Sequence, residues 1–377
     1  MVVCRFEDAV GDRTLNLCGF VTKVTACSAQ ELPTAVAEIE QYQREGHWIA
    51  LKLNYSLGEW LEPALRRGDV QGVSEARFSA YVFERCDETR ASAESSNHSA
   101  RIVSAKPRLG FVEYREKILN IKSRIENGDV YQVNFTLPID VIFEGSPIAL
   151  YQTLIEQHPV SHAAYIDDGE SAVLSISPEL FVERRGNCLT SRPMKGTAPR
   201  HHDPEEDARS AYALRNSPKD RAENAMIVDL LRNDMGRIAQ TGGVRVESLF
   251  DLERYPSVWT LTSTIKADIG SASFMDVLRA MFPCGSIVGA PKIAAMRCID
   301  ELELSDRGLY CGSIGWMSPT GDYSLNVAIR TLVLKKDGTG VYGVGGGIVI
   351  DSEPSLEWSE CQWKSRVIRG STTEIWQ

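Results

Sequence analysis

Hairpin-type turn signals between short β-rich runs constrain the fold of this chain more than any other feature of its sequence. Four such turns separate apolar runs beyond residue 162, and they are Asp167-Asp168-Gly169, Arg185-Gly186-Asn187, Thr320-Gly321-Asp322 and Lys336-Asp337-Gly338. Turns in which Gly accompanies Asp or Asn join neighbouring antiparallel strands. Helical segments lie between these hairpins. We therefore predict an α+β fold, a layered α/β sandwich with two large, mainly antiparallel sheets and helices packed outside.

Serine and Ser-Pro signals indicate where the helices begin. A serine that caps a helix is often followed by proline in the first turn. On this basis we predict a helix that starts at Ser146-Pro147, a helix from Ser28 to Tyr42, and helices over residues 217–239, 273–282, 291–304 and 355–369. Tyr and Ile residues at helical spacing predict a further helix over 114–125.

The chain is predicted to contain two unequal parts. Residues 87–107 are rich in Ser, Ala and charged residues and poor in large apolar side chains, which is typical of a linker. We therefore divide the chain into a short N-terminal α/β portion, 1–108, and a main domain, 109–377. The polar stretch that contains His201 and His202 is predicted to be a solvated loop.

Composition and charge argue against several classes of protein. The 41 Lys and Arg against 51 Asp and Glu give a formal charge of −10, which disfavours a nucleic acid partner. The nine cysteines are scattered and contain no C-x-x-C pair, so we expect reduced thiols rather than disulfides or a zinc site. No apolar run approaches the length of a membrane span, and the first residues do not resemble a signal peptide. We expect a cytoplasmic protein with no membrane partner.

Two acidic pairs are candidates for a metal site. Asp220 and Glu223 lie three residues apart on one predicted helix, and Glu357 and Glu360 have the same spacing on another, with Lys364 on the same face. Carboxylates on two helices are suitable ligands for Mg²⁺. From the spacing alone, however, solvated helix faces are the more common explanation.

Glycine-rich segments and one lysine are further candidates for a functional site. Gly345, Gly346 and Gly347 precede a β-rich run, which argues against a dinucleotide fingerprint and instead indicates a close approach of the backbone to a ligand or another segment. Residues 284–292 lead into a helix and could receive an anion or simply cap that helix. Lys195 lies between a proline and a glycine, where the chain turns. An isolated lysine is usually a surface residue, and as a nucleophile it would have to be neutral.

Taken together, the motifs resemble the chorismate-utilising enzymes, a family that includes component I of anthranilate synthase, component I of aminodeoxychorismate synthase, and isochorismate and salicylate synthases. The similarity runs in order from about residue 110 to 370 through SPELF (177–181), PMKGT (193–197), AENAMIVDLLRNDMGRIA (222–239), FPCGSIVGAPK (282–292), ELELSDRGLYCGSIG (301–315), AIRT (328–331) and GGGIVIDSEPSLEWSE (345–360). The resemblance implies a site between two large sheets, with Mg²⁺ as cofactor and 109–377 as the catalytic domain.

The resemblance also assigns roles to individual residues. It implies that Glu223 and Glu360 bind Mg²⁺, with Asp220 and Glu357 as their acidic partners one helical turn earlier. It implies that Glu179 is the general acid for loss of the C4 hydroxyl. The positions that match substrate contacts are Gly196, Thr197, Tyr310, Arg330, Gly345, Gly346, Gly347 and Lys364.

Lys195 indicates which member of the family this chain resembles. It looks like the lysine that marks aminodeoxychorismate synthases, where anthranilate synthases typically carry alanine. In the mechanism proposed for that group, the lysine attacks C2, ammonia then adds at C4, and 4-amino-4-deoxychorismate forms for 4-aminobenzoate and folate synthesis. Gln132 occupies the position of the water-activating lysine of isochorismate synthases, which favours ammonia over water as the nucleophile.

The resemblance leaves two alternatives and implies a partner. The alternatives are anthranilate synthase component I and a non-catalytic chorismate-binding homologue; the latter is suggested by Thr260, which replaces a histidine found in many members. No glutamine amidotransferase motif is present, so a separate amidotransferase subunit, component II, is expected to supply ammonia from glutamine. An element typical of tryptophan-inhibited members is also missing.

Overall fold

Antiparallel strand pairs form the centre of this protein, whose computed structural model describes residues 2–65, 75–90, 100–255 and 258–368. Within those residues, hydrogen bonds connect 18 strands into one network. The strands are β1 (Val3–Asp8), β2 (Arg13–Ala26), β3 (Trp48–Leu53), β4 (Phe78–Thr89), β5 (Ala100–Pro107), β6 (Gln132–Gly145), β7 (His162–Asp167), β8 (Ser171–Ser177), β9 (Leu180–Arg185), β10 (Cys188–Arg192), β11 (Met194–Pro199), β12 (Val244–Arg254), β13 (Val258–Asp268), β14 (Gly289–Ala290), β15 (Ser313–Met317), β16 (Tyr323–Val327), β17 (Thr331–Lys335) and β18 (Thr339–Ile348).

The four predicted hairpins are confirmed. They join β7 to β8, β9 to β10, β15 to β16 and β17 to β18, and every one of these pairs is antiparallel. The turn glycines adopt positive φ angles, for example +81° at Gly169 and +88° at Gly321, which a residue with a side chain rarely adopts. The antiparallel α+β architecture predicted from these turns is therefore correct.

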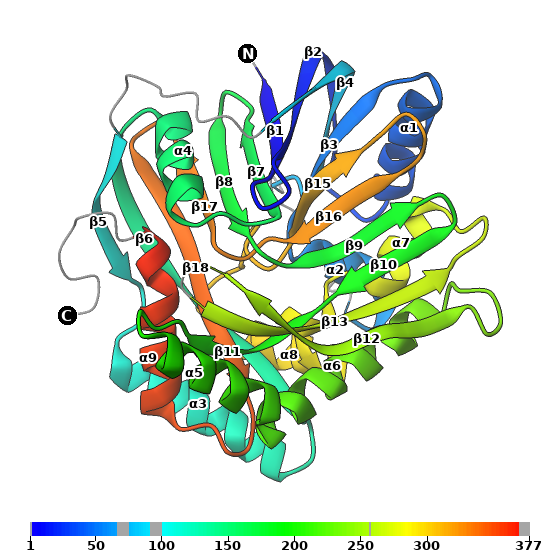
Figure 1. The fold of residues 1–377 in the computed structure, drawn as a ribbon. Coiled ribbons are helices and arrows are strands. Elements are labelled where there is room, and N and C mark those ends of the chain that lie inside the picture. Colours follow the sequence, from blue (N-terminus) through cyan, green and yellow to red (C-terminus); the bar gives the residue numbers. More distant parts are fainter. Residues whose placement is uncertain (1, 66–74, 91–99, 256–257, 369–377) are drawn as a thin grey trace.

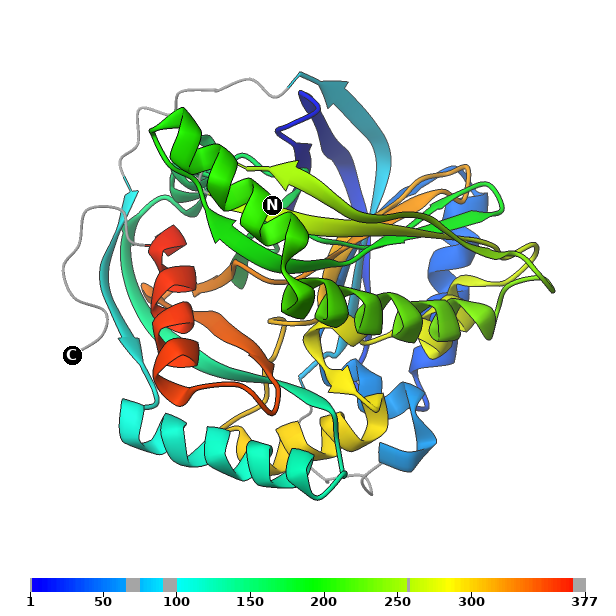
Figure 2. The same cartoon turned by 60° about the horizontal axis from the view of Figure 1, so that its bottom comes forward.

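Helices cover the outside of the strands, as Figures 1 and 2 show. They are α1 (Leu32–Arg44), α2 (Leu57–Leu61), α3 (Phe111–Glu126), α4 (Pro147–Gln157), α5 (Pro204–Asn216), α6 (Pro218–Gly236), α7 (Phe274–Met281), α8 (Lys292–Leu302) and α9 (Pro354–Lys364), with short 3₁₀ turns η1 (Pro63–Leu65), η2 (Gly285–Ile287) and η3 (Ser365–Ile368). Tyr114, Ile118 and Ile121 of α3 are fully buried, which confirms the helical face predicted there. Burial of each isoleucine contributes about 1.5–3 kcal/mol.

Helix starts were predicted well at Ser217 and Ser273 and less well at Ser28. The side chain of Ser217 accepts a hydrogen bond from the backbone of Asp220 at the start of α6, and Ser273 forms a capping box with Asp276 at the start of α7. The prediction that Ser28 caps a helix is wrong, because α1 begins only at Leu32 and Ser28 instead bonds the backbone N–H of Glu31.

His201 and His202 lie in an exposed loop as predicted, but the rest of that polar stretch begins helix α5. It starts directly after these histidines, with Asp203 as its cap and Pro204 in its first turn. The carboxylate of Asp203 accepts hydrogen bonds from the backbone N–H groups of Glu205 and Glu206. An aspartate followed by proline and acidic residues is a helix-start signal that the high polarity of the segment concealed.

The linker predicted over residues 87–107 is wrong at both ends. Strand β4 continues to Thr89, and residues 100–107 form β5, which pairs with β6; positions 91–99 of the predicted linker lie outside the described residues. The segment is polar because much of β5 is exposed, with only Ile102 fully buried. Residues 1–108 also share the sheet with the rest of the chain, since β1 pairs with β7 and β3 pairs with β15.

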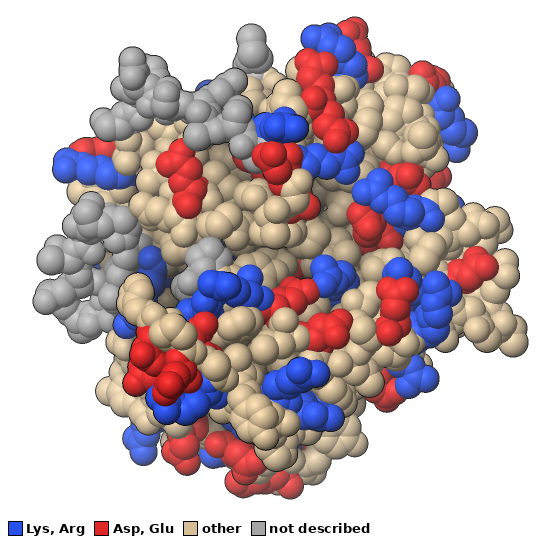
Figure 3. Space-filling model, in the orientation of Figure 1, with Lys and Arg blue, Asp and Glu red and all other residues tan. Residues whose placement is uncertain are grey.

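No helix in the described part of the chain is both long and apolar enough to cross a membrane. On the face shown in Figure 3, acidic and basic side chains are interspersed rather than gathered into one field of a single sign.

Candidate active site

One cavity of about 580 Å³ gathers the residues that the sequence motifs marked. Strands β11 and β18 and helices α6 and α9 contribute to its walls. All of the predicted site residues except Gly346 line it, namely Glu179, Lys195, Gly196, Thr197, Asp220, Glu223, Tyr310, Arg330, Gly345, Gly347, Glu357, Glu360 and Lys364. Motifs that are up to 185 residues apart in the sequence therefore meet at one place.

The glycine run of β18 lets three groups approach the strand closely. A Cβ on Gly345 would stand 2.3 Å from the backbone oxygen of Phe135 on the neighbouring strand β6. A Cβ on Gly346 would stand 3.3 Å from Oε2 of Glu357, and one on Gly347 only 2.4 Å from Nε2 of Gln132. The predicted close approach is confirmed, and Gly346 borders the cavity through the carboxylate that it faces.

A β-bulge presents Lys195. The pairing of β11 with β13 shifts register between Lys195 and Thr197, and Gly196 within this bulge has a φ of +83°. A Cβ on Gly196 would meet Asp220 at 2.9 Å, so this glycine also lets the first turn of α6 come close. Thr260 stabilises the bulge, because its Oγ1 donates a hydrogen bond to the carbonyl of Gly196 at 3.0 Å.

Glu179 is a buried carboxyl between β8 and β9. Its side chain is 4% exposed, and Ser286 donates a hydrogen bond to its Oε1 at 2.7 Å. Burial raises the pKa of Glu179, while the bond from Ser286 and the charges of Lys195 and Lys364 partly oppose that rise. A raised pKa favours the protonated form that a general acid needs.

Arg330 and Tyr310 contribute a cation and a ring to the cavity. The backbone of Arg330 has a φ of +49°, a strained conformation for a residue with a side chain. Burial lowers the pKa of this guanidinium, and among the described residues no carboxylate forms an ion pair with it. Tyr310 packs against Gly343, where a Cβ would stand 2.2 Å from the ring. An arginine without a protein counter-ion is available to bind a ligand carboxylate.

Helices α6 and α9 bring the two acidic pairs to the same cavity. Burial raises the pKa of Glu223, and the neighbouring Asp220 and Glu360 raise it further, while Lys195 and Lys219 oppose them. Burial also raises the pKa of Glu357, which accepts a hydrogen bond from Ser352 at 2.7 Å. Because Glu360 on α9 raises the pKa of Glu223 on α6, the two acidic pairs face a common space.

The carboxylates suit Mg²⁺ in their chemistry but are not gathered around one point. Within the described ranges, no group of three or more His, Cys, Asp and Glu side chains lies close enough together to hold a metal ion. Lysines pair with two of the four carboxylates instead. Lys364 lies 2.6 Å from Oε1 of Glu360, and Lys219 lies 4.0 Å from Oε1 of Glu223. Carboxylate oxygens are the ligands that Mg²⁺ prefers, but binding here would require the carboxylates to move together and Glu360 to leave Lys364.

Gln132 stands behind the cavity wall with an unsatisfied side chain. It is fully buried, and neither Nε2 nor Oε1 has a hydrogen-bond partner among the described residues. Its Nε2 and Nζ of Lys195 lie 2.4 and 3.6 Å, respectively, from the point where a Cβ on Gly347 would stand. The resemblance placed Gln132 at a functional position, and in the structure Gln132 and Lys195 both approach Gly347.

Three further residues join the site only through the fold. Ser286 reaches Glu179 across 107 residues of sequence, Lys219 faces the carboxylates from the first turn of α6, and Asn134 lines the wall from β6. The sequence marked residues 284–292 as a possible anion loop but did not single out the serine. Within this segment Lys292 bonds Asp234 and the carbonyl of Met281, so its role is structural.

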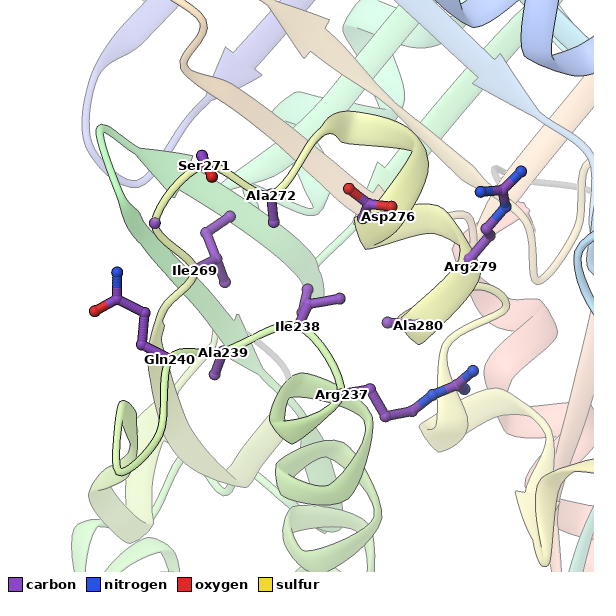
Figure 4. Close-up of a pocket in the computed structure, with 11 residues that line it drawn as sticks. Arg237, Ile238, Ala239, Gln240, Ile269, Ser271, Ala272, Asp276, Arg279 and Ala280 are labelled. Atoms are coloured by element: carbon purple, nitrogen blue, oxygen red, sulfur yellow. The ribbon is translucent and has the colours of Figure 1, made fainter.

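A second cavity, of about 450 Å³, lies at the opposite end of α6 and beside α7 (Figure 4). Its lining includes Arg237, Gln240, Asp276 and Arg279 but none of the predicted site residues. Because the candidate acid, nucleophile and carboxylates all meet at the first cavity, we assign the active site there.

Comparison with known proteins identifies the family of this chain. The sequence model of a family described as chorismate binding enzyme matches residues 35–370. Aminodeoxychorismate synthase component 1 of Klebsiella aerogenes is 46% identical over 249 residues, which are 66% of this chain and 55% of that protein. The protein of the same name from Bacillus subtilis is 39% identical over 252 residues, covering 67% and 53%. Anthranilate synthase component 1 of Streptomyces coelicolor is 37% identical over 280 residues, covering 74% and 54%.

Solved structures show the same fold. Anthranilate synthase component I of Streptococcus pneumoniae has a TM-score of 0.74 at 27% identity, covering 86% of this chain and 80% of its own. The menaquinone-specific isochorismate synthase of Escherichia coli has a TM-score of 0.77 at 18% identity, covering 98% and 88%. The matching region spans about half the length of the curated relatives. Since the family model covers most of the sequence, the chain belongs to the chorismate-binding enzyme family.

Proposed function

We propose that this chain is component I of an aminodeoxychorismate synthase, which converts chorismate and ammonia to 4-amino-4-deoxychorismate. The observation that carries the proposal is the placement of Lys195 and Glu179 on one cavity, the lysine in a bulge and the acid buried and hydrogen bonded. The relatives from Klebsiella aerogenes and Bacillus subtilis bear this name and support it. The product would serve 4-aminobenzoate and folate synthesis in the cytoplasm.

The chemistry divides one displacement into two steps. Nζ of Lys195 bonds to C2 of chorismate while the C4–O bond breaks, and Glu179 gives its proton to the departing oxygen, which leaves as water. Ammonia then bonds to C4, the bond between C2 and Nζ breaks, and the lysine is restored. Covalent catalysis of this kind replaces a difficult step by two easier ones.

Basic groups make an acidic protein receptive to an anionic substrate. The formal charge of −10 works against long-range attraction of a dicarboxylate. Inside the cavity, Arg330 and Lys364 provide positive charge, and Arg330 suits a bidentate carboxylate contact. Asp220, Glu223, Glu357 and Glu360 would hold Mg²⁺, which when bound supplies a fixed positive charge for a substrate carboxylate.

Ammonia is proposed to come from a second protein. The relatives' names contain the term component 1, which supports a complementary component. We propose a glutamine amidotransferase subunit, component II, as that partner, whereas free ammonium should replace it in a test with the chain alone.

Product identification tests the proposal. The protein is incubated with chorismate, Mg²⁺ and ammonium, with and without an added aminodeoxychorismate lyase. We expect 4-aminobenzoate only in the presence of the lyase. Fluorescent anthranilate in the absence of the lyase would instead establish anthranilate synthase activity, the alternative that the Streptomyces coelicolor relative favours.

A non-catalytic, chorismate-binding role is the second alternative. The observation that favours it is Thr260, which is engaged with the backbone of Gly196 and offers no imidazole to the reaction. Calorimetry that shows chorismate binding, combined with no product in the presence of ammonium, would support this role.

A further inference from the structure

Ser286 contacts the carboxyl of the candidate acid, as does the backbone N–H of Met194. Ser286 lies in the η2 turn, is 2% exposed and lines the cavity. Its Oγ donates a hydrogen bond to Oε1 of Glu179 at 2.7 Å and lies 3.2 Å from Sγ of Cys284. A hydroxyl with one proton can donate to only one acceptor at a time. Because Oε1 of Glu179 lies closer to Oγ and is the stronger acceptor, the hydroxyl of Ser286 donates to Glu179 and not to Cys284.

The η2 turn is held in place by Arg307. The buried guanidinium of Arg307 donates hydrogen bonds to the carbonyls of Ile287 at 2.9 Å and Asn134 at 2.6 Å. Glu303 pairs with the same guanidinium at 2.8 Å. Because the backbone beside Ser286 is anchored, its hydroxyl is presented to Glu179 in a defined position.

We propose that Ser286 is a positioning residue that determines which oxygen of Glu179 carries the acid proton, an inference that rests on the proposed function. A protonated carboxyl has one O–H and one carbonyl oxygen. The donation from Ser286 makes Oε1 the carbonyl oxygen, so the proton resides on Oε2. From Oε2 it passes to the C4 oxygen of the substrate as the C4–O bond breaks, water departs, and Glu179 remains as a carboxylate that still accepts the bond from Ser286.

The charges around Glu179 set the direction of the expected effect. Lys364 and Arg330 act on it as cations, Lys195 does so whenever it is protonated, and the thiols of Cys284 and Cys311 are the other titratable groups that face it. Burial raises the pKa of Glu179, and the bond from Ser286 opposes this rise. Removal of the serine hydroxyl should therefore raise the pKa further.

The test compares Ser286→Ala, Ser286→Thr and a matched control, Ser191→Ala. Ser191 is also buried and bonds a backbone carbonyl, that of Phe181, but it does not contact Glu179. We expect Ser286→Ala to lower kcat by about 10- to 100-fold with little change in KM, since general acids contribute about 10²- to 10⁴-fold. The alkaline limb of the pH–rate profile of Ser286→Ala should move to higher pH, because a general acid with a higher pKa stays protonated up to a higher pH. Ser286→Thr should restore both properties.

Infrared titration of the carboxyl band provides a measurement that does not need turnover. The band of protonated Glu179 is assigned with Glu179→Gln and followed with pH in wild type and Ser286→Ala. An unmoved titration in Ser286→Ala, or an equal change in Ser191→Ala, would overturn the proposal. If wild-type protein makes no 4-amino-4-deoxychorismate, the proposed function fails, whereas the infrared result still decides whether Ser286 governs Glu179.

Discussion

Lys364 and Glu360 form an ion pair of 2.6 Å one helical turn apart on α9, and the same ammonium donates to the carbonyl of Gly345 at 2.7 Å. The charge of Lys364 is the main cause that lowers the pKa of Glu360. A cation bound at Glu360 would therefore have to compete with Lys364 for the carboxylate. Lys364 also connects α9 to the glycine run of β18.

We predict that Glu360→Ala weakens Mg²⁺ binding by at least about tenfold, because an anionic ligand is lost from a small oxygen donor set. Calorimetric titration of the ligand-free protein with Mg²⁺ measures this effect without turnover. Glu353→Ala, an exposed carboxylate at the start of the same helix, is the control. Equal Mg²⁺ affinity in wild type and Glu360→Ala would contradict the ligand assignment.

Lys195→Ala should reduce amination of chorismate by at least about 100-fold while chorismate affinity stays within about tenfold, since the variant loses a nucleophile but keeps Arg330 and Lys364. Turnover and calorimetric binding are measured together. Lys335→Ala, at the end of β17 and remote in sequence from the motif, serves as the matched lysine control. A Lys195→Ala variant with wild-type turnover would remove the proposed covalent step.

His162 should make stability depend on pH. Burial lowers its pKa from 6.5 to about 4. Because the unfolded chain binds this proton at higher pH than the folded protein, the free energy of unfolding should fall as pH decreases from about 6.5 to 4, by up to about 3 kcal/mol. Urea unfolding at several pH values measures the effect. His162→Leu should flatten this part of the curve, and a wild-type histidine signal that titrates near 6.5 by NMR would refute the prediction.

Two glycines of one strand should respond differently to alanine. In Gly345→Ala the new methyl would meet a backbone oxygen at 2.3 Å, so we expect about 1–3 kcal/mol of destabilisation from overpacking. In Gly347→Ala it would meet the ends of two flexible side chains, Gln132 and Lys195, which can move. This variant should lose activity with a change in stability below about 1 kcal/mol. Similar losses of stability in both variants would contradict the geometric distinction.

The sequence predicted the fold where local chemistry decides it. Glycine turns between apolar runs define the hairpins, and serine caps such as Ser217 and Ser273 define helix starts. It failed for β5, whose polar residues are stabilised by pairing with β6, a contact that no local pattern reveals. It also failed for α5, where the Asp203 cap signal was outweighed by polarity.

The site was predicted from motifs that match the family. Contacts between residues that are distant in the sequence could not be predicted in this way. Roles could be transferred to Glu179, Lys195 and the acidic pairs because each lies in a recognisable motif. Ser286 was not predicted because its partner, Glu179, is 107 residues away in the sequence. The ion pair of Lys364 with Glu360 could be anticipated from helical spacing, but the bond of Lys364 to Gly345 depends on how α9 packs on β18.

Gln132 provides the last prediction, because its buried carboxamide has no partner among the described residues. A buried polar group that lacks a hydrogen bond costs about 1–3 kcal/mol, and such a cost is tolerated where function requires it. Methionine has a similar size and needs no hydrogen bonds. We therefore expect Gln132→Met to raise the free energy of unfolding by about 1 kcal/mol in the absence of ligand and to lower amination at least about tenfold. Denaturation and turnover assays measure the two effects. If Gln132→Met gains stability but keeps full activity, the carboxamide does not serve the reaction; if it loses stability, Gln132 has a partner such as a bound water.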